Sequence, residues 1–187
     1  MNKWIIGWGR IGAAQCAGIF LAENAMLGSV MSAEKFWGLG SATFEGKTSI
    51  QRIRQYGLAV FHDAFACEKM TIIGKAFAEK GLQVAELKLS GSFMVGGKVQ
   101  ATEIHLNIKA DSRVADLEAD VIVVKSCAKI ELDTVIGTHV YLENVHANKV
   151  SGNAVCIGGK SVIQEVEAAR VSVGPNAFVH QVVRKKS

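Results

Sequence analysis

A glycine-rich run near the N-terminus is the first candidate for ligand chemistry. The residues from Gly7 to Gly12 read G-x-G-x-x-G, a pattern that in dinucleotide-binding folds places a pyrophosphate at the N-terminus of a helix. This alternative, a dinucleotide-dependent enzyme, needs a helix over Ala13 to Ala25, with Glu23 as the nearest acid for a ribose hydroxyl. Beyond Ala25, however, the chain follows a seventeen-residue repeat instead of alternating strands and helices. We therefore prefer the interpretation that these glycines lie at turns, and we expect no cofactor.

The histidines and carboxylates offer a second kind of chemistry, because general acid–base catalysis needs a base held beside an acid or a nucleophile. His62 next to Asp63, and His105 two residues after Glu103, come nearest to that arrangement. In a strand, successive side chains point to opposite faces, so His62 and Asp63 should diverge while Glu103 and His105 share a face. We expect surface roles for these side chains, no catalytic residue, and a protein that is not an enzyme.

The cysteines could form disulfides or bind zinc, but their spacing argues against both. Cys16, Cys67, Cys127 and Cys156 lie far apart, and none belongs to a C-x-x-C pair. Zinc sites usually take ligands that are clustered in the sequence. The sequence therefore predicts four buried, reduced thiols and no metal site.

The composition describes a folded chain of about one domain. Of 187 residues, 49% are apolar, and 21 basic residues against 17 acidic ones give a net charge of +4, which excludes an intrinsically disordered chain. No basic stripe with interleaved aromatic residues is present, so we expect no nucleic-acid partner. The basic cluster from Arg184 to Lys186 is expected to solubilise the chain end rather than bind an anionic membrane. The longest apolar stretch, residues 11–22, is shorter than the roughly 20 residues that span a bilayer, so we expect a soluble, cytoplasmic protein.

A repeat of seventeen residues organises the elements that carry these groups. One apolar column holds Ile19, Phe36, Ile53, Met70, Leu87, Ile104 and Val121. A column of mainly alanine holds Ala25, Ala42, Ala59, Ala76, Phe93 and Ala110. Glycines recur at Gly40, Gly57, Gly74 and Gly91. Acidic or amide side chains close most rows, at Glu34, Gln51, Glu68, Glu86, Glu103 and Asp120.

The C-terminal part repeats at a shorter interval. The sequence from Val155 to Gly158 returns sixteen residues later as Val171 to Gly174, and a looser copy begins at Ile136, twenty-one residues before Ile157. No linker separates the two patterns. We therefore predict one domain over residues 1–187, with a first sub-stack over 1–130 and a second sub-stack over 131–187.

Each row alternates apolar and polar residues in about three short bursts, as in Ile104-His105-Leu106. A period of two indicates strand, and seventeen residues are too few for a helical-pair repeat, which needs about 33, or a leucine-rich repeat, which needs at least about 20. Three short strands per row form one coil of a parallel β-helix. The sequence thus predicts an all-β, single-stranded parallel β-helix, with about ten coils stacked at ~4.8 Å over roughly 50 Å.

The ends of such a solenoid are candidates for self-association. Terminal coils expose backbone groups and apolar side chains unless a segment covers them, and here the rows begin and end with apolar residues. The residues we expect to make these contacts are Trp4, Ile5 and Ile6 at one end, and Phe178, Val182 and Val183 at the other. The expected partner is a second copy of the chain, in a homopolymer or homo-oligomer.

The cadence of these rows resembles the bactofilins, the polymer-forming cytoskeletal proteins of bacteria. Leu87 to Glu103 carries the resemblance most clearly, and Val140 to Asn144 with Val155 to Gly159 resemble the C-terminal region of variants from spore-forming, Gram-positive bacteria. The resemblance covers the chain from about Ala33 to Val183. It implies a right-handed β-helix that polymerises through its ends without nucleotide. It also implies a cytoplasmic scaffold, often at the membrane, that serves cell shape, wall synthesis or motility together with cell-wall or motility proteins.

A second enzymatic alternative is an acyltransferase of the hexapeptide-repeat type, which is also a β-helix. Those enzymes need an aliphatic residue at every sixth position and eighteen residues per coil. The period here is seventeen, and hexads such as the one at Ile157 do not run in tandem.

Overall fold

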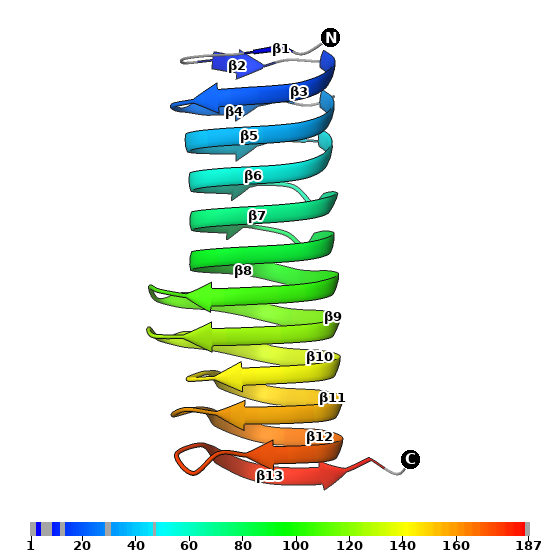
Figure 1. Cartoon of the computed structure of the whole chain (residues 1–187), viewed down its shortest axis with the longest axis vertical. Helices are drawn as coiled ribbons and strands as arrows, with labels where there is room; N and C mark the ends of the chain where they lie inside the picture. Colours follow the sequence, from blue (N-terminus) through cyan, green and yellow to red (C-terminus); the bar gives the residue numbers. More distant parts are fainter. Residues whose placement is uncertain (1–2, 5–8, 12–13, 29–30, 47, 186–187) are drawn as a thin grey trace.

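The structure, a computed structural model, describes residues 3–4, 9–11, 14–28, 31–46 and 48–185. Within these ranges the chain is all strand and turn, and its strands join one parallel sheet that winds into a tall stack, with the N-terminus at one end and the C-terminus at the other (Figure 1). The described strands are β1 (Lys3–Trp4), β2 (Gly9–Ile11), β3 (Ala14–Ala22), β4 (Ala25–Leu27), β5 (Met31–Phe44), β6 (Thr48–Phe61), β7 (Phe65–Ala78), β8 (Leu82–Ile108), β9 (Ser112–Ser126), β10 (Ile130–Glu143), β11 (His146–Gly158), β12 (Val162–Val173) and β13 (Phe178–Arg184). The prediction of a parallel β-helix is confirmed.

Each coil has three faces, which β7 illustrates. The inward–outward alternation of its side chains breaks at Glu68–Lys69 and again around Gly74, so the strand turns two corners. We call residues 65–67 and their equivalents the first face, 69–73 the second face and 75–78 the third face. Parallel pairing continues through the corners, with a register of seventeen residues from β5 to β8. The predicted three short segments per coil are therefore present, joined into single bent strands.

The predicted apolar column forms the core on the second face, with one error. Ile19, Phe36, Ile53, Met70 and Leu87 pair in sequence, and each is at most 4% exposed. The prediction is wrong at its last member, because Ile104 pairs with Ile122 and not with Val121. The coil that follows β8 is one residue longer, so the seventeen-residue count fails there.

The alanine column is confirmed through Phe93 and fails at Ala110. Ala42, Ala59, Ala76 and Phe93 pair in register and are buried. Ala110 is exposed in the loop after β8, and the next position in the column belongs to Ser112, whose Oγ accepts a hydrogen bond from the Phe93 amide at 2.9 Å. Again the cause is a longer coil.

Buried phenylalanines fill the space that the small alanines leave on the third face. The rings of Phe44 and Phe61 stack with centroids 4.7 Å apart and planes 9° from parallel, and Phe65 lies 5.0 Å from Phe61. Where Phe93 replaces an alanine, the position two residues later is the smaller Val95. In these coils a phenylalanine in one column thus lies beside a smaller side chain in the other column, which keeps the interior close-packed.

Glycines form the corner between the second and third faces. Gly57, Gly74 and Gly91 pair in register, and Gly74 has a φ of 136°, in a region that residues with a Cβ rarely adopt. A Cβ at Gly74 would lie 2.1 Å from the carbonyl oxygen of Gly57. The column of glycines is therefore set by backbone conformation and by the close approach of successive coils.

Among the buried polar side chains is the amide of Gln55, which lies inside the core. Gln55 is 1% exposed, and its Nε2 donates hydrogen bonds to the carbonyl oxygens of Gly40 and Leu58, at 2.9 and 3.2 Å. Its Oε1 has no hydrogen-bond partner among the described residues. Gly38 is its neighbour in the previous coil, and a Cβ there would lie 1.9 Å from Oε1, so the amide occupies space that the glycine leaves free.

The corner that carries the loops changes within β8. Strands β5 to β7 begin on the first face and end on the third, whereas β9 to β11 begin on the third face and end on the second. β8 spans the change with 27 residues, and lower coils in Figure 1 carry their loops on the left. The register is eighteen residues between β9 and β10, fifteen between β10 and β11, and sixteen thereafter.

The shorter repeat is confirmed in part. Val155 pairs with Val171, as the sixteen-residue interval predicts. The predicted alignment of Ile136 with Ile157, twenty-one residues later, is wrong, because Ile136 pairs with Ser151, fifteen residues later. The loop between β10 and β11 has two residues, and this shortens the coil.

The N-terminal glycine run leads into strand, not helix. Gly9–Ile11 forms β2, which pairs with β4, and the next described residues form β3. Gly7, Trp8 and Gly12 lie outside the described residues. Among the residues that the structure describes, no helix is long and apolar enough to cross a membrane.

Candidate functional site

In the part of the chain that the structure describes, the C-terminal edge of the sheet is formed by β13 (Phe178–Arg184). β13 is last in the strand order of the described residues and pairs there with β12 alone. Of the residues predicted to self-associate, Phe178 is 55%, Val182 48% and Val183 39% exposed. The structure thus places all three on the terminal coil with much of their apolar surface in solvent.

Register shows which of these side chains continue the core. Val182 pairs with Val166 and, further up the column, Val150, which are both fully buried. Phe178 pairs with Val162, and Val183 with Glu167, and these partners are partly exposed on the outer surface. Val182 is therefore the end of an interior column, while Phe178 and Val183 lie on the outside of the last coil.

Three further valines end interior columns and were not predicted as contact residues. Val171 follows buried Val155, and Val173 follows buried Ile157. Val179 follows Ile163, which is fully buried. With Val182, these residues form the set that we call the terminal valines: Val171, Val173, Val179 and Val182. The sixteen-residue repeat contains the signal that identifies them, because it aligns each one with a core residue.

The N-terminal end is described only in part. β1 (Lys3–Trp4) pairs with Ile19 and Phe20 of β3 and begins the strand order. The predicted contact residue Trp4 therefore belongs to the first strand, and Ile5 and Ile6 lie outside the described residues.

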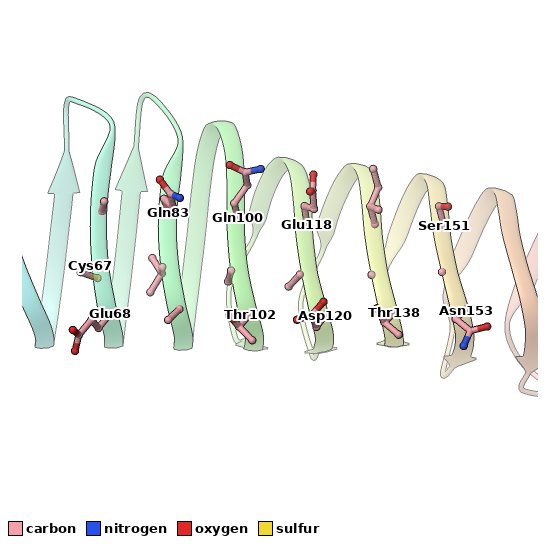
Figure 2. Close-up of a pocket in the computed structure, with 18 of the residues that line it drawn as sticks. Cys67, Glu68, Gln83, Gln100, Thr102, Glu118, Asp120, Thr138, Ser151 and Asn153 are labelled. Carbon is pink, nitrogen blue, oxygen red and sulfur yellow. The ribbon is translucent and has the colours of Figure 1, made fainter.

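A groove runs along the first face, parallel to the axis of the stack. It has a volume of about 1180 Å³ and extends through the coils from Ser49 to Ala169. Figure 2 shows side chains along its two sides, with Gln83, Gln100, Glu118 and Ser151 in one row. The opposite row holds Glu68, Thr102, Asp120, Thr138 and Asn153. Between the rows, the floor is formed by Ile50, Cys67, Val84, Ala101, Ala119, Gly137 and Gly152, and it consists only of Ala and Gly from Ala101 onward.

The groove carries more negative than positive charge. Among the described residues, Glu68 and Asp120 have no ion-pair partner, while Glu118 pairs with Lys98. At the C-terminal end of the groove, Nζ of Lys185 donates a hydrogen bond to Oγ of Ser151 at 2.7 Å, and it lies 4.0 Å from Oε1 of Glu167.

Of the two histidine pairs, only Glu103 and His105 lie on a strand, where they share a face as predicted, whereas His62 and Asp63 lie in the turn between β6 and β7. His62 Nδ1 lies 2.7 Å from Oε1 of Glu79, one coil further on, whereas Asp63 accepts a hydrogen bond from Lys80 at 2.6 Å. His105 Nε2 lies 3.6 Å from Oε2 of Glu103 on the same strand. These contacts are exposed, and no cluster of three metal-binding side chains occurs among the residues described.

The predicted acidic column is wrong, because it mixes two neighbouring positions. Gln51, Glu68 and Asp120 occupy the corner after the first face, but Glu86 pairs with Lys69 and Glu103 with Val121, one position further along. The misplaced glutamates belong to a cross-coil charge network. Glu86 accepts hydrogen bonds from Lys69 at 2.5 Å and from Lys88 at 2.6 Å.

We expect this network to make the free energy of unfolding of the solenoid pH-dependent. The hydrogen bonds from Lys69 and then Lys88 lower the pKa of Glu86 from 4.5 to about 2. A lowered carboxyl pKa stabilises the folded state above the unfolded-state value, and the effect is lost as the pH falls through the folded-state value. Glu86→Gln is therefore expected to destabilise the protein most above about pH 4.5 and least near pH 2, as measured by urea unfolding across that range. Glu68→Gln is the control, because Glu68 has no ion-pair partner among the described residues; equal pH dependence of both variants would contradict this assignment.

The cysteine prediction is wrong at two positions. Cys127 lies exposed in the loop after β9, and Cys156 is exposed on β11 between inward-facing Val155 and Ile157. Cys67 is half-buried in the groove floor, and its burial raises the pKa of the thiol to about 12, so it remains a protonated, weakly reactive thiol. Cys67, Cys127 and Cys156 are free. Alternation along β11, rather than residue type, decides the exposure of Cys156.

Comparisons with family models, curated proteins and solved structures find no significant match to the chain.

Proposed function

We propose that this protein is a non-enzymatic scaffold that assembles end to end into filaments without a nucleotide. The observation that carries the proposal is the open core at the C-terminal end. There the interior columns stop at the terminal valines, and Val173 and Val182 remain 43% and 48% exposed. A further coil from another copy would bury these side chains as each coil buries the one before it, and burial of apolar surface drives association.

The free edge of β13 supports the same arrangement. An unpaired strand edge presents N–H and C=O groups that can pair with another chain. The first strand of a second copy would extend the parallel sheet, so the contact joins two different ends. A contact of this heterologous kind, if it does not close into a ring, produces an open filament. Backbone pairing and apolar burial supply the free energy of assembly, so the reaction needs no nucleotide.

The resemblance to the bactofilins points in the same direction. It suggests a cytoplasmic scaffold for cell shape, wall synthesis or motility. Its contacts with membranes, cell-wall proteins or motility proteins would be made along the sides of the filament, because the ends are used in assembly.

Substitution of Val182 by arginine tests the proposal. A charged side chain at the end of a core column would be desolvated in the filament, which is costly unless it is paired, whereas in the monomer it remains in solvent. We expect Val182→Arg to stay folded by circular dichroism and to lose large assemblies in sedimentation velocity and electron microscopy, with at least a tenfold higher concentration needed for assembly. Addition of ATP or GTP is expected to change nothing.

Ile73→Arg is the matched control, because Ile73 is similarly exposed, at 46%, on the side of β7 in the middle of the stack. It should assemble as the wild type does. A wild-type protein that stays monomeric at high concentration, or that stops at a finite dimer, would refute filament formation.

A further inference from the structure

The groove on the first face has the form of a binding site for an extended chain. Its floor is made mostly of small side chains, and polar side chains stand on both sides (Figure 2). The amides of Gln83 and Gln100 stand on one side, and the hydroxyl of Thr102 and the amide of Asn153 stand on the other. Such groups can donate to and accept from a peptide backbone that lies along the axis.

The charges in the groove select a basic occupant. Glu68 and Asp120 carry carboxylates that no ion pair neutralises among the described residues, and both line the same row. Negative groups in a groove repel phosphates, so a nucleic acid is disfavoured. None of the residues described along the groove is aromatic, so the site lacks the stacking surfaces that Trp and Tyr provide with their broad, amphipathic rings.

A lysine of the chain itself already occupies the end of the groove. Lys185 enters the last coil, where its ammonium donates to Ser151, a side chain buried to 7% exposure, and lies near Glu167. This contact is an example of an ammonium held by a side chain that lines the groove, in the row opposite Glu68 and Asp120. Glu68 and Asp120 offer carboxylates, which bind an ammonium more strongly than a hydroxyl does.

The spacing of the two free carboxylates matches an extended polypeptide. Glu68 and Asp120 occupy coils three steps apart, which at ~4.8 Å per step gives about 14 Å. An extended chain rises about 3.4 Å per residue, so four residues also span about 14 Å. Lysines at every fourth position of an extended segment would therefore meet Glu68 and Asp120 in turn.

We propose that this groove binds an extended, lysine-containing polypeptide segment, with lysines four residues apart held by Glu68 and Asp120. The site lies on the side of the solenoid, and its function does not depend on end-to-end assembly. A filament would present one such groove per copy, and so would display a basic partner segment at regular intervals along its length.

A labelled peptide tests the proposal directly. The probe is a fluorescein-labelled peptide with the repeating sequence Lys-Ser-Gly-Ser, and its binding to the full chain is followed by fluorescence anisotropy. A second peptide of the same composition, with its lysines consecutive, tests the spacing. We expect the spaced peptide to bind at least fivefold more tightly than the clustered one, and its affinity to fall as salt is added, because ion pairs are screened.

The double variant Glu68→Gln with Asp120→Asn is expected to bind the spaced peptide at least tenfold more weakly. The matched control is Asp111→Asn with Glu131→Gln, which removes the same charge from residues outside the groove and should bind as the wild type does. Equal loss in both double variants would show binding by net charge alone and overturn the proposal. Failure of the wild type to bind the spaced peptide, or equal affinity for the clustered peptide, would overturn it as well, whatever the state of assembly.

Discussion

Replacement of Gly74 by alanine is expected to destabilise the protein by at least about 3 kcal/mol. The φ of 136° at this residue strains any residue with a Cβ, at a cost of about 1–3 kcal/mol. In addition, the new Cβ would lie 2.1 Å from the carbonyl oxygen of Gly57, so two coils must move apart and weaken their ladder of backbone hydrogen bonds. Urea unfolding followed by circular dichroism measures the change.

Gly158→Ala is the matched control for this substitution. Gly158 ends β11, and an added Cβ there would meet its nearest atom, the hydroxyl of Tyr141, at 3.8 Å. We expect a change within about 1 kcal/mol, because alanine also restricts the unfolded chain. If the two substitutions cost the same, close approach of the coils at the glycine corner is not what constrains Gly74.

Removal of the Phe61 ring is the second substitution with a large expected effect. Phe61 is fully buried between Phe44 and Phe65, and truncation of a buried phenylalanine to alanine costs about 3–5 kcal/mol. The cavity cannot be filled from the next coil, because its partner there is Ala78. The midpoint of urea unfolding should fall accordingly.

Phe77→Ala provides the comparison, since Phe77 is 42% exposed on the outer side of the third face. We expect it to change the free energy of unfolding by less than about 1 kcal/mol. A loss at Phe77 equal to that at Phe61 would mean that the third face is covered by another surface in solution.

The sequence predicts the fold because stacked coils place like residues above one another. Ile53, Met70 and Leu87 recur at one interval, and this regularity identifies the core without any contact information. The errors at Val121 and Ala110 share a cause. A coil lengthens by adding residues to a polar loop, and such an insertion changes no apolar pattern that would reveal it.

The site is less predictable than the fold. Phe178 and Val183 stand out by residue type, but register places them on the outside of the last coil. Val171 and Val173 end interior columns, which follows from their sixteen-residue offset from Val155 and Ile157. No sequence pattern predicted the groove, because its floor residues are separated by seventeen, eighteen or fifteen positions, depending on the coil.

The buried amide of Gln55 affects which coils of the chain can pair with one another during folding. Neighbouring coils have similar columns of apolar residues. A coil could therefore pair with the wrong neighbour and still align its apolar side chains. Gln55, however, fits beside Gly38, whereas a slip of one coil would set it against Leu21, which precedes Gly38 in the same column. The bulk of leucine would meet the amide where the glycine leaves space. This pair therefore favours the stack in which Gln55 lies beside Gly38 over a stack that is shifted by one coil.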